Sequence, residues 1–165
     1  MALRAAQTDG QPVEVEPEWP SAAARILHAR LSAGLTHTEV ARRLKASVHS
    51  YDDLERYDDE AFTVLSLQQL LALGKALNVE PRVLLLGQEA SSATLAVTFR
   101  DISARLAERI AREGQTVDEF GDRIGWNIEP LLNDPDALWS FDVEALYAIC
   151  SALELDWVAA LPTNS

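Results

Sequence analysis

The feature that most constrains this chain is an internal repeat with an offset of 80 residues. A Thr followed three residues later by a Glu occurs at Thr36 and Glu39, and again at Thr116 and Glu119. Glycine and apolar positions agree with the same offset: Gly34, Val40, Leu44 and Val48 correspond to Gly114, Phe120, Ile124 and Ile128. Farther along, the offset becomes 76, and the matched positions are Leu65, Leu67, Leu70, Leu73, Ala76, Leu77 and Val79 with Phe141, Val143, Leu146, Ile149, Ala152, Leu153 and Leu155. The sequence therefore predicts two copies of one fold, the second shorter by four residues.

The stretch from Leu35 to Glu55 predicts two short helices joined by a tight turn. Thr36 and Glu39 have the spacing of a capping box, in which each side chain accepts a hydrogen bond from the other's backbone N–H. After a short break, Ser47 is a second N-cap candidate. Apolar residues recur at helical spacing in both helices: Val40, Ala41 and Leu44, then Val48, Tyr51 and Leu54. A second helix after so short a break must cross the first at a steep angle.

This stretch resembles the helix-turn-helix of the lambda-repressor-like (Xre/Cro-type) family. In that family's pattern an apolar residue ends the first helix, as Leu44 does, and a Ser begins the recognition helix, as Ser47 does. A small and an apolar residue fill the turn, where this chain has Lys45 and Ala46, and an apolar–Glu pair such as Leu54-Glu55 closes the recognition helix. The resemblance covers about residues 22–87. Together with the repeat, it implies an all-α chain of two tandem five-helix helix-turn-helix domains without a sheet.

Composition and the repeat together predict the domain boundaries. The expected parts are a flexible acidic tail at 1–20, a first helix-turn-helix domain at 21–87, a linker at 88–97 and a second, degenerate helix-turn-helix domain at 98–165. We call residues 21–87 the first copy and residues 98–165 the second copy. Trp19, in the tail, is interpreted as an anchor at the edge of the core or, alternatively, as a partner contact.

Further local signals lie in the first copy. Ser21 is the candidate N-cap of its first helix, and Ser66 with Gln69 has the spacing of another capping box. The stretch 57–64 contains three consecutive acidic residues, Asp58 to Glu60. Since their spacing matches no calcium loop, we interpret this stretch as a solvated loop rather than a cation site.

The cysteine content and the hydropathy pattern exclude disulfide-rich and membrane-spanning classes of protein. The single cysteine, Cys150, lies in an apolar helical pattern and is interpreted as a small core residue, so no internal disulfide is expected. No apolar run approaches the roughly 20 residues of a membrane span, and residues 1–10 lack the apolar centre of a signal peptide. We therefore expect a cytoplasmic protein without a membrane partner.

Catalysis and metal binding have no support in the sequence. The three histidines, His28, His37 and His49, form no paired metal-binding face with cysteine or with a carboxylate cluster. No glycine-rich phosphate loop and no nucleophile elbow occurs. The expectation is a protein that is not an enzyme and that has no metal site and no cofactor.

DNA binding is the first functional hypothesis, and it depends on how charge is distributed. The whole chain has 14 Lys and Arg against 26 Asp and Glu, a net charge of −12, which counts against a generic nucleic-acid binder. The first copy alone, however, has eight bases and eight acids. It groups Arg42, Arg43 and Lys45 beside the turn, where phosphates would lie in a helix-turn-helix complex. An ordinary solvated helix face explains this cluster equally well.

The resemblance also implies which residues of the first copy face the groove. They are Val48, His49, Asp52 and Asp53, and the candidate DNA-binding set is Arg42, Arg43, Lys45, Ser47, Val48, His49 and Asp52. His49 could donate to a base edge, and Val48 could contact a thymine methyl group. Asp52 and its neighbour Asp53 count against this hypothesis, because carboxylates beside the phosphate backbone lower affinity.

Protein interaction is the second hypothesis, and the second copy favours it. It has five bases against 13 acids, a net charge of −8, and prolines at Pro130 and Pro135 interrupt its third helix. Trp126 stands where the first copy has Ala46, and tryptophan is enriched at interface hot spots. The candidate partner-binding set is Trp126, Glu129, Asp134 and Asp136, although tryptophans filling a small core are the simpler explanation.

The functional prediction is a transcriptional-regulator-like protein that contacts DNA through the first copy. The second copy would have lost DNA binding and would serve for homodimerisation or docking of a protein partner. The alternative is an acidic interaction module, such as an antitoxin, an immunity factor or a DNA mimic, that does not contact DNA.

Overall fold

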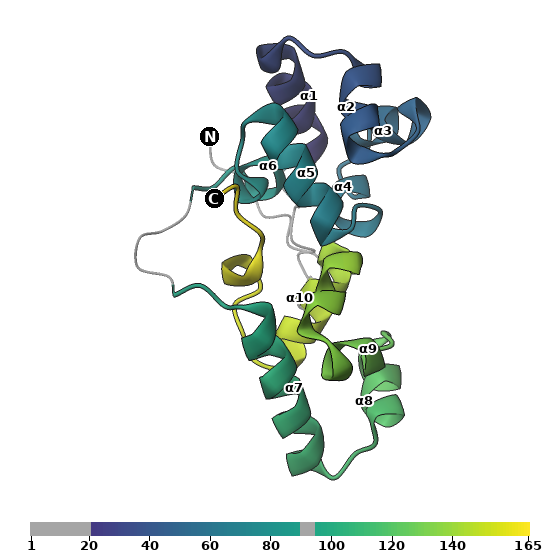
Figure 1. The fold of residues 1–165 in the computed structure, drawn as a ribbon, viewed down its shortest axis with the longest axis vertical. Coiled ribbons are helices and arrows are strands. Elements are labelled where there is room, and N and C mark those ends of the chain that lie inside the picture. Colours follow the sequence, from purple (N-terminus) through teal and green to yellow (C-terminus); the bar gives the residue numbers. More distant parts are fainter. Residues whose placement is uncertain (1–20, 90–94) are drawn as a thin grey trace, which may run out of the picture.

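The computed structural model describes residues 21–89 and 95–165, and in this part of the chain every regular element is a helix (Figure 1). The first copy contains α1 (Ala22–Ala33), α2 (His37–Leu44), α3 (Val48–Leu54), α4 (Glu60–Thr63), α5 (Leu67–Leu77) and α6 (Pro81–Leu86). The second copy contains α7 (Phe99–Glu113), α8 (Val117–Ile124), α9 (Glu129–Asn133), the 3-10 helix η1 (Pro135–Ser140), α10 (Val143–Ala152) and the 3-10 helix η2 (Val158–Ala160). The all-α prediction is confirmed. The predicted tail with Trp19, and the middle of the predicted linker, lie outside the described residues.

The helix bounds follow the offsets of the sequence repeat. The helix α8 has the bounds of α2 shifted by 80 residues, and α10 begins 76 residues after α5. The capping boxes predicted at Thr36, Ser66 and Thr116 are all formed. The Thr36 N–H, for example, donates to Glu39 Oε2 at 2.7 Å. Local sequence therefore sets where these helices begin.

Two details of the first copy differ from the predictions. Between Ser21 and Gly87 there are six helices rather than five, because the expected loop contains the short helix α4. The Ser21 side chain does not cap α1. Instead Asp58 Oδ1 accepts hydrogen bonds from the Ala23 N–H and the Ser21 hydroxyl, each at 3.1 Å. An acidic residue from a distant loop therefore supplies the cap, which a local reading of the sequence could not find.

The third helix of the second copy is short, as the prolines predict. Pro130 lies in the first turn of α9, where its missing N–H costs nothing, and Pro135 begins η1. The Asn127 side chain accepts from the Glu129 N–H at 3.1 Å. The second copy therefore keeps the order of elements of the first with a shortened α9.

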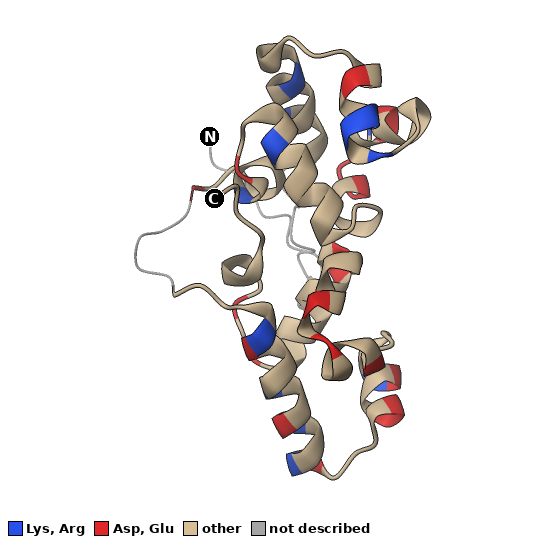
Figure 2. Ribbon diagram, in the orientation of Figure 1, with Lys and Arg blue, Asp and Glu red and all other residues tan. Residues whose placement is uncertain are grey.

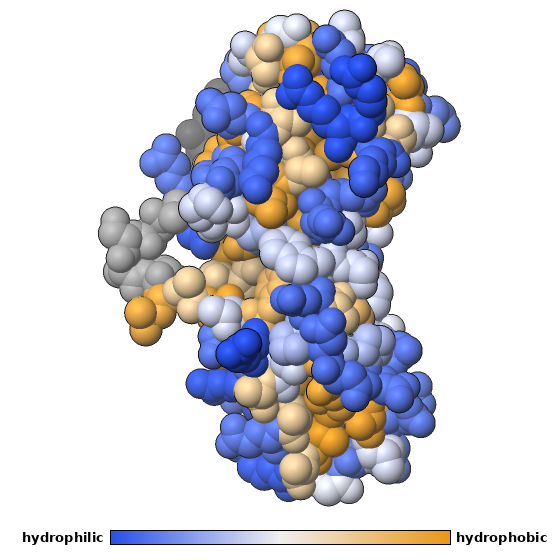
Figure 3. All heavy atoms as spheres, viewed as in Figure 1, coloured by the Kyte–Doolittle hydropathy of each residue, from blue (hydrophilic) through white to orange (hydrophobic). Residues whose placement is uncertain are grey.

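The two copies pack against each other end to end (Figure 1). The Leu67 N–H at the start of α5 donates to the Phe141 carbonyl before α10 at 2.8 Å. On the other side, Asn164 Nδ2 donates to the Val79 carbonyl at 3.0 Å. Buried residues of both copies form one hydrophobic cluster, and hydrophilic residues cover much of the surface in view (Figure 3). The two copies are therefore fixed relative to each other by backbone pairing and a shared core.

Candidate nucleic-acid interface and partner surface

The corner between α2 and α3 is a tight turn built from local hydrogen bonds. The helix α2 ends at Lys45, whose backbone is in the left-handed region with φ of 54°. The Ala46 N–H donates to the Ala41 carbonyl at 3.0 Å, which closes the end of α2. Ser47 then caps α3, because its hydroxyl accepts from the Ser50 N–H at 3.0 Å. The start of α3 is thereby held at a defined place beside the end of α2.

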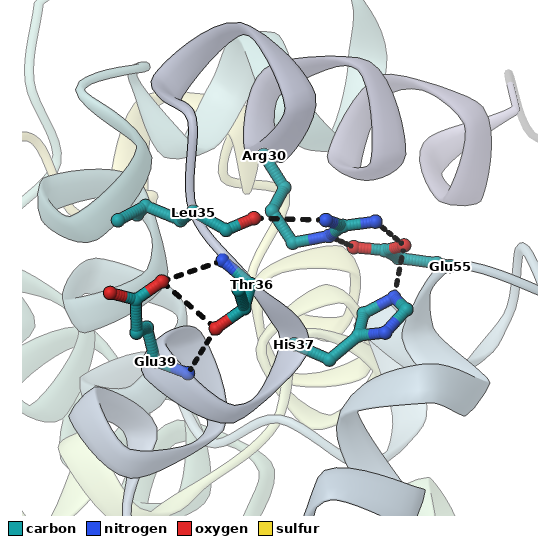
Figure 4. A network of polar contacts seen from close by, with 6 residues as sticks. All are labelled: Arg30, Leu35, Thr36, His37, Glu39 and Glu55. Atoms are coloured by element: carbon teal, nitrogen blue, oxygen red, sulfur yellow. Dashed lines mark hydrogen bonds and ion pairs between the residues drawn. The ribbon is translucent and has the colours of Figure 1, made fainter.

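A buried ion-pair network fixes this corner to α1 (Figure 4). Arg30 donates from Nε to Glu55 Oε1 at 2.5 Å and from NH2 to Glu55 Oε2 at 3.0 Å. The third contact of Arg30 is from NH1 to the Leu35 carbonyl at 2.9 Å. His37 Nε2 lies 2.9 Å from Glu55 Oε2. Only 10% of the Arg30 side chain and 5% of the Glu55 side chain are exposed. One guanidinium therefore joins α1, the loop before α2 and the end of α3.

The electrostatics of the network keep both partners ionised. Burial alone would raise the pKa of Glu55, but the hydrogen bonds with Arg30 and His37 outweigh it, so the pKa lies below its ordinary value. The hydrogen bond to Glu55 raises the pKa of Arg30. Burial raises the pKa of the Tyr51 phenol, whose ring lies 5.8 Å from the His37 ring. Arg30 and Glu55 therefore stay ionised at neutral pH, which suits a structural ion pair.

The predicted phosphate-contacting residues lie on the outer side of this corner. Arg42, Arg43 and Lys45 are exposed, and no carboxylate of the described residues lies within ion-pair distance of any of them. Arg43 is partly held, since its NH1 donates to the Ala76 carbonyl at 3.3 Å. The three cationic side chains that are neighbours in the sequence therefore also lie together and exposed beside the turn.

The first half of α3 is the more exposed half. Ser47 is exposed, Val48 is 45% exposed and the His49 side chain is 88% exposed. Asp52 and Asp53 are half-buried, with 28% and 27% of their side chains exposed. Asp52 pairs with Arg56 at 2.8 Å, and Asp53 lies 3.8 Å from His49 Nε2. Each of the two acids therefore has a basic neighbour one turn away.

The matching corner of the second copy is hollow and acidic. A hollow of about 490 Å³ lies over the turn and is lined by Val117, Asp118, Gly121, Asp122, Gly125, Trp126, Asn127 and Ile128. Asp122 and Gly125 stand where the first copy has Arg42 and Lys45. Asp122 therefore reverses the charge of Arg42, whereas Arg123 keeps the charge of Arg43, and α8 carries acidic residues beside this one arginine (Figure 2). Sequence reasoning singled out neither Asp118 nor Asp122, although the charge reversal was readable from the 80-residue offset.

The tryptophans of the second copy all contact aromatic rings. Trp126 is half-buried, and its ring lies 6.4 Å from that of Phe141. Trp139 packs edge-on against Phe99 at 4.8 Å, and Trp157 against Tyr147 at 5.9 Å. Each of these tryptophans also packs on the hydrophobic core. Trp126 differs from the other two because it also lines the acidic hollow.

The acidic residues predicted for partner binding do not share one role. Glu129 and Asp136 are exposed. Asp134 is also exposed, but its carboxylate accepts from the Asp136 N–H at 3.0 Å and caps η1. Of the predicted set, only Trp126 lines the hollow, so the structure does not gather the four residues into a single site.

The described residues offer no metal site, no exposed thiol and no membrane-spanning helix. No group of three or more potential ligands that could hold a metal ion occurs within residues 21–89 and 95–165. Cys150 is buried, and burial raises the pKa of its thiol to about 12. In the same part of the chain, the helices are too short or too polar to cross a membrane. Comparison with protein families, curated proteins and solved structures finds no match.

Proposed function

We propose that this protein is a DNA-binding, transcriptional-regulator-like protein whose first copy contacts DNA through the corner between α2 and α3. The observation that supports this most is the set of three available cations beside an exposed helix start. Arg42, Arg43 and Lys45 lie without carboxylate partners next to the exposed Val48 and His49. In helix-turn-helix complexes, cations near the turn neutralise phosphates while the start of the second helix enters the major groove.

The half-buried ion pairs of α3 support the proposal, because they reduce the repulsion expected from its acids. Asp52 is neutralised locally by Arg56 at 2.8 Å. The arginine side of this pair is exposed and screened by solvent, but a paired carboxylate still repels phosphate less than a free one. Asp52 is therefore assigned a positioning role on α3 and not a base contact.

The buried Arg30–Glu55 network also supports DNA binding by the first copy, because it holds α3 in place. A recognition element must be held rigidly, since errors of position cost both affinity and selectivity. Two hydrogen bonds fix Glu55, at the end of α3, to Arg30 of α1, and Glu55 also contacts His37 of α2. The second copy has no counterpart, because Ile110 and Pro135 stand at the positions of Arg30 and Glu55. In this proposal the second copy has lost DNA binding and docks a protein partner.

The deciding experiment is an electrophoretic shift assay with genomic fragments and random fragments over a salt series. Selective binding that weakens steeply with salt supports the proposal. Arg42→Ala should weaken binding to all sequences and lower the salt slope by about one unit. Arg100→Ala is the matched control, an exposed arginine of the second copy that should leave binding unchanged. His49→Ala should instead relax preference at one base pair, by roughly 1–3 kcal/mol.

A second candidate function is an acidic protein-interaction module that does not contact DNA. The net charge of −12 and the acidic hollow favour it. It predicts that both genomic and random fragments stay unshifted at low salt. That result would end the DNA-binding proposal, as would an Arg42→Ala variant with unchanged affinity.

A further inference from the structure

The hollow over the turn of the second copy has the chemistry of a site for a cationic side chain. Asp118 and Asp122 are one helical turn apart on α8, so their carboxylates share a face. Both are exposed, and neither has an ion pair with a described basic residue. Trp126 supplies an aromatic wall to the same hollow. Carboxylates beside an indole ring favour arginine, which can pair with the acids and stack on the ring.

The neighbouring arginine of the second copy is engaged elsewhere. Arg123 NH1 lies 2.9 Å from Glu113 Oε2, and its guanidinium stacks over the Phe120 ring at 4.5 Å. Arg123 therefore does not neutralise Asp118 or Asp122. Within residues 21–89 and 95–165 no basic side chain pairs with either acid, so the hollow is open to a cation from another molecule.

The complementary surface is present on this chain itself. Arg42 and Lys45 occupy, on the first copy, the positions that hold Asp122 and Gly125 at the hollow of the second. Arg42 and Lys45 are exposed. They lie at the end of α2 in the first copy, and the hollow lies at the end of the matching helix α8 in the second copy. We propose that the basic corner of one molecule, formed by Arg42, Arg43 and Lys45, docks into the acidic hollow of a second molecule. This inference rests on the proposed function, in which the second copy docks a protein partner, and it identifies that partner as another molecule of the same chain.

The charge of each copy determines the arrangement that results. The second copy has a net charge of −8, whereas the first is neutral with eight bases and eight acids. Pairing second copies with each other would bring like charges together, but a head-to-tail contact avoids this cost. The two surfaces differ, so the contact either occurs twice in an antiparallel two-fold dimer or repeats head to tail in a chain or a closed ring. The corners lie on the outer helices of the two halves, which leaves both accessible (Figure 1).

The test is sedimentation velocity of the full chain over a range of protein concentrations. The weight-average sedimentation coefficient should rise with concentration at about 0.01 M ionic strength. It should rise less at about 0.15 M, where the screening length falls from about 30 Å to about 8 Å. Asp122→Arg and Arg42→Asp should each abolish the rise. The double variant carrying both changes should restore it, because the charges are exchanged and the contact is kept.

Matched controls separate this contact from an effect of net charge. Glu108→Arg and Arg100→Asp alter exposed residues of α7 by the same charge steps and should leave association unchanged. Circular dichroism of each variant checks the fold. The inference is overturned if the wild-type chain stays monomeric at all concentrations. It is also overturned if the Asp122→Arg, Arg42→Asp double variant does not associate, or if either control variant associates as poorly as Asp122→Arg. The docking contact covers the proposed DNA surface, so a shift assay on Asp122→Arg, whose own change lies outside that surface, tests DNA binding with the docking contact removed.

Discussion

Replacing Arg30 with Met tests whether the buried network holds the first copy together. The substitution keeps an unbranched side chain of similar length but removes the guanidinium. Both oxygens of Glu55 then lose a donor, and the Leu35 carbonyl loses one as well. Glu55 stays buried, with 5% of its side chain exposed, and keeps His37 at 2.9 Å. Removing one partner of a buried ion pair leaves an uncompensated charge in a region of low dielectric constant.

The expected loss of stability follows from this burial. Breaking a buried pair costs about 3–5 kcal/mol. For a chain of about 150–250 residues, each kcal/mol lowers Tm by about 2–4 °C, so the variant should melt roughly 6–20 °C below wild type. The measurement is urea and thermal unfolding followed by circular dichroism at 222 nm. Arg56→Met is the control: its pair with Asp52 is exposed on the arginine side at 64%, so its loss should cost no more than about 1 kcal/mol.

A double substitution distinguishes loss of the pair from loss of packing. Arg30→Met combined with Glu55→Leu removes both charges and leaves apolar side chains in a buried site. This variant should recover most of the lost stability, because replacing a buried pair by apolar residues is often neutral. The reasoning is refuted if Arg30→Met costs less than about 1 kcal/mol. It is equally refuted if the two single changes simply add in the double variant.

Three further outcomes are expected. The pKa of Glu55 is lower in the folded state than its ordinary value, so its contribution to stability is present above about pH 4.3 and is lost as pH falls through the folded pKa. Glu55→Gln should thus be less stable at neutral pH yet show a flatter acid unfolding profile, and an unchanged profile would contradict this. Gly121→Ala should destabilise the second copy by about 1–3 kcal/mol, because a Cβ there would lie 2.7 Å from the Trp126 carbonyl oxygen; an unaltered urea midpoint would show that the corner relaxes freely. Cys150 should resist a thiol reagent at pH 8 in the native state and react after unfolding, since it is buried and its pKa is raised to about 12; prompt native labelling would contradict its placement.

Local sequence determined the helix boundaries and most caps of this protein. A capping box closes over three residues, so Thr36 with Glu39 and Ser66 with Gln69 could be predicted without knowledge of the fold. The grouping of Arg42, Arg43 and Lys45 was likewise evident, because neighbours on a short helix end stay neighbours in any fold that keeps the helix. The spacing of apolar residues sufficed for the all-α class, since it encodes which face of each helix is buried.

Tertiary structure alone decided the contacts between distant residues. Arg30 and Glu55 meet across 25 positions, and Asp58 caps a helix that begins more than 30 residues earlier. Such pairs depend on how helices pack, and no local periodicity records them. The pair of Asp52 with Arg56 is different, because it is an i,i+4 contact that helical spacing alone could have predicted. The acidic hollow brings Asp118 and Asp122 of α8 together with Trp126 of the following turn, and charge and empty volume coincide there only once the chain is folded.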